Sequence, residues 1–388
     1  MTAERVCNPH RSTSYYDTAK GCLRNDIWDL LTINRLREAN YSAHASNISH
    51  FIARPDRHAQ ILAGIIAIPP RSIWLRHGDK WSVALASDCK PVKKATLEGI
   101  TKTASRLLHV LDKKALAVEL SGGLDTSIII GLLNDMGLNP LLVGFSSDKF
   151  EFRTEKVIQD KYASCTEAVL LPQDESLPFS GLLDCPSHQL PSSTSLFYTH
   201  ALSVAKVCVS KNIRILLSGM GFDSLLCDAI PDTLTKECAD LWSPWTLDDN
   251  WFNEYVYSRH NIVYKSGAAS RYLMRIVTSL RSGKGEDTQK RMTRKIFERY
   301  LPVELVRYAY KADNCTGFIE GFLQNETLVR TVFREARKIT RRAEFDSNVA
   351  DTLLQNIHKN EDAIMKSVLS RVSFATWLYC LNRDGKIG

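Results

Sequence analysis

Short apolar runs alternate with longer amphipathic stretches through the middle of the chain. The apolar runs occur at residues 115–120, 140–145, 168–171 and 213–217. The stretches between them predict helices over 126–136, 153–163 and 196–210, the last one opened by capping candidates at 192–195. Apolar runs of this length, separated by helices, are typical of βαβ units with buried parallel strands. The pattern therefore predicts an α/β domain, a parallel sheet with flanking helices.

The two ends of the chain have a different texture. Before residue 95 the sequence is irregular and rich in Asn, Ser and His, with one apolar run, Ile61–Ile68, that predicts a strand closed by the turn Pro69-Pro70. A helix is predicted from about residue 95 to residue 111, and from about Trp245 the pattern is helical to the end. We therefore expect a truncated N-terminal domain over 1–94 and a second domain over 95–388, with a helical C-terminal part.

The last predicted helix carries an apolar stripe. Its members are Ile364, Met365, Val368, Leu369 and Val372, which repeat at helical spacing. Such a stripe is typical of a helix that packs one face on a core. We expect these side chains to be core residues.

Composition places the chain among ordinary globular proteins. Of its 388 residues, 44% are hydrophobic and 24% charged, which excludes disordered and collagen-like chains. No apolar stretch approaches the roughly 20 residues of a membrane-spanning helix, and no signal peptide is legible. The ten cysteines are scattered from Cys7 to Cys380 without a Cys-x-x-Cys pair, so we expect reduced thiols and no structural zinc. These features predict a cytoplasmic protein without a membrane partner.

Positive charge is concentrated in one segment. The formal net charge is +7, and residues 264–311 hold twelve Lys or Arg against four acidic residues. Such a segment favours an anionic ligand, although a solvated basic surface has the same composition. Both interpretations stay open at this point.

The strongest chemical signal is a glycine turn between the predicted strand 115–120 and the predicted helix 126–136. Its sequence is Ser121-Gly122-Gly123-Leu124-Asp125-Thr126-Ser127. Glycines let the backbone approach phosphate oxygens, and the N-terminus of the following helix directs N–H groups and a positive dipole end at them. The spacing fits neither a Walker A loop nor a dinucleotide-binding loop. Asp125 places a carboxylate in this phosphate site and so predicts a cation, Mg²⁺, between them. An ordinary strand-to-helix turn is the alternative.

A second turn of the same kind follows the strand predicted at 213–217. Its sequence is Ser218-Gly219-Met220-Gly221-Phe222-Asp223. Open parallel sheets bind ligands at the carboxyl ends of their strands, so Asp125 and Asp223 are expected to face one Mg²⁺–phosphate group. Taken alone, a Ser-Gly-x-Gly turn is common and is equally compatible with a structural role.

Together the two motifs resemble the pyrophosphate loop and the second metal loop of the asparagine-synthetase-like ATP pyrophosphatases, which cleave ATP between the α and β phosphates. The resemblance runs from about Ala95 to the C-terminus and includes Glu155. It implies a Rossmann-like adenine nucleotide α-hydrolase fold that uses ATP and Mg²⁺, with Asp125 and Asp223 as metal ligands. The implied contacts to ATP and pyrophosphate are Ser121, Gly122, Gly123, Leu124, Asp125, Thr126, Ser127, Val143, Gly144, Phe145, Ser218, Gly219 and Gly221.

The resemblance also implies catalytic residues. Lys311 follows the turn Leu301-Pro302, where the family has a lysine that contacts the phosphates. Departure of pyrophosphate builds up negative charge that a positioned cation stabilises, which supports the same role; a lone surface lysine is the alternative. Met220 stands where asparagine synthetases have Glu and β-lactam synthetases Tyr, and methionine cannot act as an acid or base. Glu254 is the candidate base, with a structural surface position as the alternative.

The N-terminal segment distinguishes between branches of the family. Asparagine synthetases carry a glutaminase domain whose cysteine attacks glutamine once the initiator Met is removed. Here position 2 is Thr2, the first cysteine is Cys7, and residues 1–94 are too short for that domain. We therefore expect a glutaminase-like remnant without its nucleophile. The C-terminal stretch 311–383 is most similar to the lasso peptide macrolactam synthetases, which join a peptide's α-amine to an Asp or Glu side chain.

The resemblance thus predicts an AMP-forming carbon–nitrogen ligase that closes a macrolactam in a ribosomal peptide precursor through an acyl-adenylate. The implied partners are a peptide or small carboxylate substrate, a leader peptidase and a leader-binding protein, with no nucleic acid. One alternative is an asparagine-synthetase-like amidotransferase or a β-lactam-type cyclase. Another is a tRNA-modifying ATP pyrophosphatase, although the lack of a Cys-x-x-Cys pair argues against the thiolation branch. A degenerate binding protein is a further alternative, against which the intact Asp125, Asp223 and Lys311 count.

Overall fold

The structure is a computed structural model of the 388-residue chain. It describes residues 4–7, 14–17, 19–24, 27–39, 62, 65–68, 72–77, 80–85, 115–146, 153–220, 252–266, 294–295, 297–307, 315–359 and 362–387. The helix predicted from residue 95 to residue 111 lies outside these ranges.

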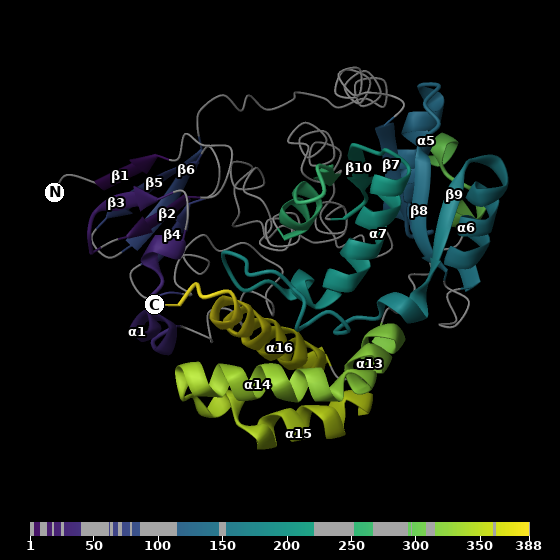
Figure 1. Ribbon diagram of the computed structural model, residues 1–388. Helices are drawn as coiled ribbons and strands as arrows, with labels where there is room; N and C mark the ends of the chain where they lie inside the picture. The colour runs from purple at the N-terminus through teal and green to yellow at the C-terminus, as the bar shows by residue number, and fades with distance from the viewer. Residues whose placement is uncertain are drawn as a thin grey trace.

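Five parallel strands form the central sheet (Figure 1). They are β7 (Leu116–Leu120), β8 (Leu141–Ser146), β9 (Ala168–Pro172), β10 (Ile215–Ser218) and β11 (Val263–Ser266). Their order across the sheet is β11-β10-β7-β8-β9, so the chain builds outward from β7 and then returns to add β10 and β11 on the other side. The strand order therefore reverses between β7 and β10, which is where open α/β sheets bind ligands.

Helices cover both faces of this sheet. α5 (Leu124–Asp135) and α6 (Arg153–Cys165) lie on one face, and α7 (Tyr198–Ser210) and a helix over residues 252–258 lie on the other. On the first face, Ile130 of α5 and Tyr162 of α6 join one apolar cluster with Val118 of β7. On the second face, Ala205 of α7 packs in a cluster with Ala117 of β7. Alternate residues of β7 thus face opposite layers, as expected for a three-layer α/β arrangement.

The strands and helices predicted between residues 115 and 218 are confirmed to within a few residues. β11 is different: the pattern after about Trp245 predicts helices alone, and this is wrong because residues 263–266 form a strand. Val263 and Lys265 are exposed, whereas Tyr264 and Ser266 are buried. This short edge strand therefore lacks the continuous apolar run that marks a strand buried on both faces.

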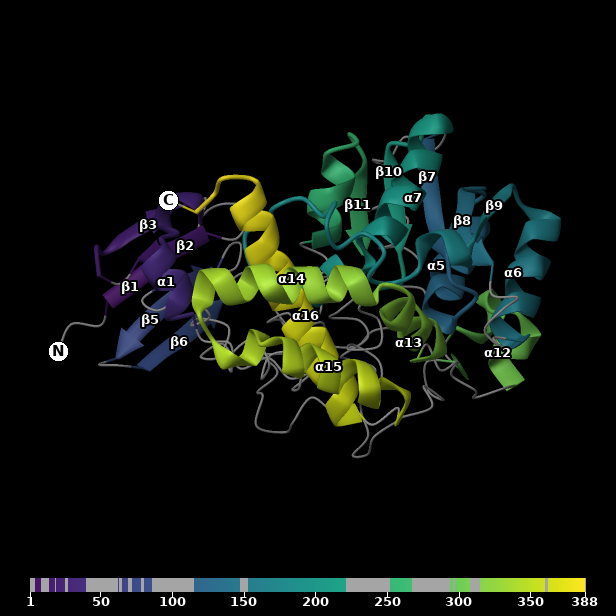
Figure 2. The ribbon, with the colours of Figure 1, turned by 60° about the horizontal axis from the view of Figure 1, so that its bottom comes forward.

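Helices make up the C-terminal part, as predicted, and α14, α15 and α16 pack together there (Figure 2). The helices are α12 (Val303–Arg307), α13 (Cys315–Gln324), α14 (Glu326–Thr340), α15 (Ser347–Asn356) and α16 (Asp362–Arg383). The predicted stripe of α16 packs on the core. Val368 and Val372 are completely buried in a cluster with Val332 of α14, and Ile364, Met365 and Leu369 are half-buried against that cluster. No helix in the described ranges is long and apolar enough to cross a bilayer.

The N-terminal residues form two antiparallel sheets. One has the order β1 (Glu4–Cys7), β5 (Ser72–His77), β6 (Lys80–Leu85), and the other β3 (Cys22–Arg24), β2 (Ser14–Asp17), β4 (Ile65–Ile68). β4 confirms the second half of the strand predicted at Ile61–Ile68. Between β3 and β4, helix α1 (Ile33–Arg37) buries Leu36 in the core that α14 and α16 share. The N-terminal part thereby packs on the C-terminal helices.

Short 3₁₀ helices complete the described structure. They are η1 (Trp28–Leu30), η3 (Gln173–Ser176), η4 (Ser193–Phe197), η6 (Glu298–Tyr300), η7 (Ala343–Phe345) and η8 (Ile357–Lys359). The predicted capping segment 192–195 acts at η4, where the Ser192 hydroxyl accepts a hydrogen bond from the Thr194 amide, and α7 follows directly. The predicted cap is therefore present, but it caps the 3₁₀ helix that precedes α7.

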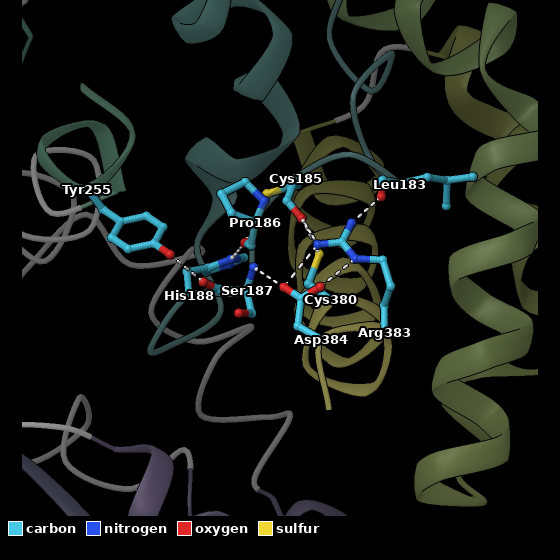
Figure 3. Close-up of polar contacts among 9 residues, drawn as sticks. All are labelled: Leu183, Cys185, Pro186, Ser187, His188, Tyr255, Cys380, Arg383 and Asp384. Atoms are coloured by element: carbon cyan, nitrogen blue, oxygen red, sulfur yellow. Dashed lines mark hydrogen bonds and ion pairs between the residues drawn. The ribbon is translucent and has the colours of Figure 1, made fainter. Parts of the chain in front are cut away.

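A polar cluster at the end of α16 ties the C-terminal helix to the loop 183–188 (Figure 3). Arg383 donates from Nη2 to the Cys185 carbonyl at 2.9 Å, and Asp384 accepts from the Ser187 amide at 3.0 Å. On the other side of the loop, the Tyr255 hydroxyl donates to the Ser187 carbonyl at 2.9 Å. The loop thus connects α16 to the helix over 252–258, which packs on the central sheet.

The cluster predicts a specific acid sensitivity. The Arg383 guanidinium, with help from the Ser187 amide, lowers the pKa of Asp384 from 3.8 to about 2. Because the folded-state pKa is depressed, the ion pair stabilises the fold above about pH 4, and this contribution is lost as the pH falls toward 2. The Asp384 side chain is 30% exposed, so the contribution is screened to about 1 kcal/mol or less. Urea unfolding of wild type and Asp384→Asn should therefore differ at pH 6 and converge near pH 2; equal differences at both pH values would contradict this.

Candidate functional site

The first glycine turn links β7 to α5 and is held by its own side chains. Gly122 adopts φ +78°, a left-handed conformation that favours glycine. The Ser121 hydroxyl accepts from the Gly123 amide at 3.2 Å and shares a hydrogen bond with the Thr126 hydroxyl at 2.8 Å. Gly123, the N-cap residue of α5, has no side chain to satisfy the first helical amides. The N-terminus of α5 therefore presents a positive dipole end that favours an anionic ligand.

Helix α6 supports this turn from behind. A methyl group placed on Gly122 would lie 2.4 Å from the carbonyl oxygen of Glu155, in the first turn of α6. The buried Gln159 amide donates to the Leu120 carbonyl at 3.2 Å and to the Phe145 carbonyl at 2.9 Å. It therefore fixes the carboxyl ends of β7 and β8 relative to each other, just before the turn begins.

The second glycine turn lies directly against the first. Ser218 ends β10, and its hydroxyl accepts from the Met220 amide at 3.1 Å. A methyl group placed on Gly219 would lie 2.8 Å from the Thr126 amide nitrogen and 3.0 Å from the Asp125 carbonyl carbon. Only glycine allows this approach, because a real Cβ is essentially never found so close to a backbone atom. The two turns predicted from the sequence thus meet at the N-terminus of α5, where the strand order reverses.

Neighbouring strands and helices hold Met220 in place. The Ser266 hydroxyl of β11 donates to the Met220 carbonyl. The Met220 sulfur lies 3.4 Å from the Asn253 amide nitrogen and 3.8 Å from the Tyr264 hydroxyl. The methionine side chain therefore points toward the helix over 252–258 and β11.

Three of the predicted ATP contacts, Val143, Gly144 and Phe145, lie on β8 near its carboxyl end. Val143 is completely buried, and Gly144 is paired with Leu120 in the ladder between β7 and β8. Phe145 faces His200 of α7, with 3.6 Å between the ring centroids. Burial lowers the pKa of His200 to about 4, so the imidazole is neutral at physiological pH. The end of β8 therefore holds a packed, uncharged aromatic pair, Phe145 and His200.

Other predicted site residues have different positions. Leu124 is buried, and Ser127 is completely buried beside Tyr162 of α6. Both side chains of α5 therefore pack inside the fold. The Glu254 carboxylate pairs with Lys265 at 3.5 Å and is 49% exposed. Glu254 therefore lies in a surface ion pair, and its role as a base stays a prediction. Gly221, Asp223 and Lys311 lie outside the described residues.

The fit of Mg²⁺ rests on Asp125. It lies in the first turn of α5 and is partly exposed, beside the cradle formed by the two glycines. Within the described ranges no group of three or more His, Cys, Asp or Glu could hold a metal alone. One carboxylate next to a phosphate cradle suits Mg²⁺, which is commonly bound by one or two carboxylates together with substrate phosphates.

Several site residues are not evident from the sequence. Asn253 and Tyr264 contact the Met220 sulfur, and neither residue type marks a phosphate site in the sequence. Their role appears once β11 and the helix over 252–258 are placed beside β10. Glu119 of β7 accepts a hydrogen bond from the Tyr257 hydroxyl at 2.9 Å. It could have been noticed in the sequence, because it is the one charged residue in the apolar run 115–120.

Comparison with known proteins adds no further constraint. The chain matches no model of a known protein family, and no curated protein matches its sequence. The chemistry of the site is therefore argued from its residues and their geometry.

Proposed function

We propose that the chain is an ATP- and Mg²⁺-dependent carbon–nitrogen ligase that activates a carboxylate as an acyl-adenylate. One observation carries this proposal: Gly219 lies against the Thr126 amide, so two glycine turns meet at the N-terminus of α5. Two backbones that approach each other this closely, beside a helix N-terminus, suit a chain of phosphates. The narrower proposal is that residues 95–388 have the adenine nucleotide α-hydrolase fold of the family that the two motifs resemble.

The chain's own residues would act on the triphosphate. The amides at the start of α5 would donate to pyrophosphate oxygens, and Asp125, with Asp223, would hold Mg²⁺. Bound there, Mg²⁺ would neutralise charge on the phosphate oxygens. Lys311 would stabilise the charge that develops as pyrophosphate leaves.

The reaction has two steps. The substrate carboxylate attacks the α-phosphorus of ATP, and the bond to the bridging oxygen of pyrophosphate breaks. An amine then attacks the acyl carbon, the bond to AMP breaks, and the amine loses one proton. Met220 has no titratable group to accept that proton, and Glu254 is paired with Lys265 at the surface. The proton acceptor is therefore sought in the substrate or solvent.

The specific substrate we propose is a peptide that supplies both the carboxylate and the amine. The product would be a macrolactam of the lasso peptide type, and orientation of the two ends would supply much of the rate. A leader peptidase and a leader-binding protein would be partners of such an enzyme. A small carboxylic acid with ammonia or its own amine is the alternative substrate class.

The test is an incubation of the full chain with Mg-ATP and two substrate sets. One set contains peptides with a free N-terminus and an internal Asp or Glu, and the other contains aspartate with ammonia. AMP together with a peptide one water lighter is the expected result. Formation of AMP only with aspartate and ammonia would indicate an amidotransferase. Release of ADP instead of AMP would contradict adenylation.

A further inference from the structure

Glu119 is a half-buried residue whose carboxyl group lies between the central sheet and the helix over 252–258. It lies on β7, whose other four residues are apolar. In the ladder between β7 and β10, Val118 pairs with Leu217, so the next residues, Glu119 and Ser218, are side by side. The carboxyl group accepts hydrogen bonds from the Ser218 hydroxyl and from the Tyr257 hydroxyl, the latter at 2.9 Å. It thus joins β7, β10 and the helix over 252–258.

These bonds lead directly to the second glycine turn. The Met220 amide donates to the Ser218 hydroxyl at 3.1 Å, and that hydroxyl donates to Glu119. On a second path, Tyr257 stacks on Tyr264 with 5.0 Å between ring centroids, and the Tyr264 hydroxyl contacts the Met220 sulfur. Glu119 is therefore linked to both the backbone amide and the side-chain sulfur of Met220.

The carboxyl group is costly at this position. Burial raises the pKa of Glu119, and the bonds from Ser218 and Tyr257 oppose that rise. Among the described residues, the titratable side chains around it are Tyr257, Tyr264 and Cys208, and none of these three carries a positive charge. An apolar side chain would fill the strand without the desolvation cost. The carboxyl group is therefore better explained by the two hydroxyl groups that it positions, those of Ser218 and Tyr257, than by a contribution to stability.

We propose that Glu119 is a positioning residue that fixes the position of the second glycine turn relative to the first. The proposal rests on the proposed ATP site, because it assigns Glu119 to the spacing between the two halves of that site. Gly219 already touches Thr126 as closely as glycine allows, so a small displacement of Ser218 would change the contact between the two turns. Glu119 itself is not assigned any contact with ATP.

The experiment compares Glu119→Gln and Glu119→Leu with wild type and with Val332→Ala. Glutamine keeps the shape and both hydrogen bonds, because the Ser218 and Tyr257 hydroxyls can reverse direction. Leucine removes both bonds. Val332 is completely buried in the helical layer, so its truncation lowers stability away from the site and serves as the control. For each protein, the KM for ATP and kcat of AMP formation are measured, together with the ¹³C-methyl NMR spectrum of the methionines.

We expect Glu119→Leu to raise the KM for ATP about tenfold or more, since misplaced binding groups lose productive contacts. Glu119→Gln should keep the wild-type KM, and Val332→Ala should lower the unfolding temperature without changing KM. The Met220 methyl signal, one of six methionine signals and assigned with Met220→Leu, should shift in Glu119→Leu alone.

Three results would overturn the proposal. Wild-type KM and an unshifted Met220 signal in Glu119→Leu would show that the turn does not depend on Glu119. A loss in Glu119→Gln equal to that in Glu119→Leu would show that the charge matters instead of the hydrogen bonds. A KM shift in Val332→Ala equal to that in Glu119→Leu would show a general effect of stability. If wild type forms no AMP, the proposed function fails, and the Met220 signal still decides whether Glu119 positions the turn.

Discussion

Replacement of Gly122 by alanine is expected to reduce AMP formation by about 100-fold or more, the scale of loss for misplaced reacting groups. The new methyl group would lie 2.4 Å from the Glu155 carbonyl oxygen, so the turn or the start of α6 must move. Alanine at φ +78° also costs about 1–2 kcal/mol in backbone conformation. The measurements are the rate of AMP formation and the free energy of unfolding in urea.

A matched control separates these two effects. Gly137 follows α5 with φ +70°, and a methyl group there would meet nothing within 4 Å. Gly137→Ala should therefore carry the backbone cost without the displacement, and so destabilise the protein while the residual folded enzyme stays active. Equal activity of the two variants, measured on folded protein, would contradict a role for the first turn in catalysis.

The second large effect is expected at Asp125. Asp125→Asn should lower kcat for AMP formation by about 100-fold or more, because a bound metal is worth several kcal/mol of charge stabilisation. The side chain is partly exposed in the first turn of α5, so the fold should persist with only a small loss of helix-dipole stabilisation. Activity is measured as a function of Mg²⁺ concentration, and the variant should require more Mg²⁺ for half-maximal rate.

Asp135 provides the control for Asp125. It lies in the last turn of the same helix, is 40% exposed, and pairs with Arg299 at 3.1 Å. Asp135→Asn removes the same charge from the opposite end of α5, so its Mg²⁺ dependence should equal that of wild type. Unchanged Mg²⁺ dependence in Asp125→Asn would remove the metal-ligand assignment.

The sequence predicts β7, β8, β9 and β10 because each forms a continuous apolar run; the first two and β10 are mostly buried, and β9 at the edge is half-buried. β11 has no continuous apolar run, because Val263 and Lys265 of this edge strand face solvent. The reversal of strand order between β7 and β10 depends on which strands pair, and local periodicity contains no information about pairing. The sequence therefore indicates two glycine turns, whereas their contact through Gly219 and Thr126 needs the sheet order.

The candidate site divides in the same way. The glycines, Ser121 and Asp125 are recognisable because special backbone geometry and phosphate chemistry restrict the residue types. Glu119 and Tyr257 are separated by 138 residues, and nothing local in either segment indicates that they share a hydrogen bond. Glu254 shows the opposite case, since it is a plausible base by residue type but lies in a surface ion pair with Lys265.

The most direct test of the central claim is a structure of the full chain bound to Mg²⁺ and α,β-methylene-ATP, which cannot be cleaved between the α and β phosphates. We expect the triphosphate at the N-terminus of α5, with its oxygens against the amides that follow Gly123 and its chain between Gly122 and Gly219. Binding elsewhere on the protein, or no binding at millimolar nucleotide, would contradict the assignment of the two glycine turns as an ATP site.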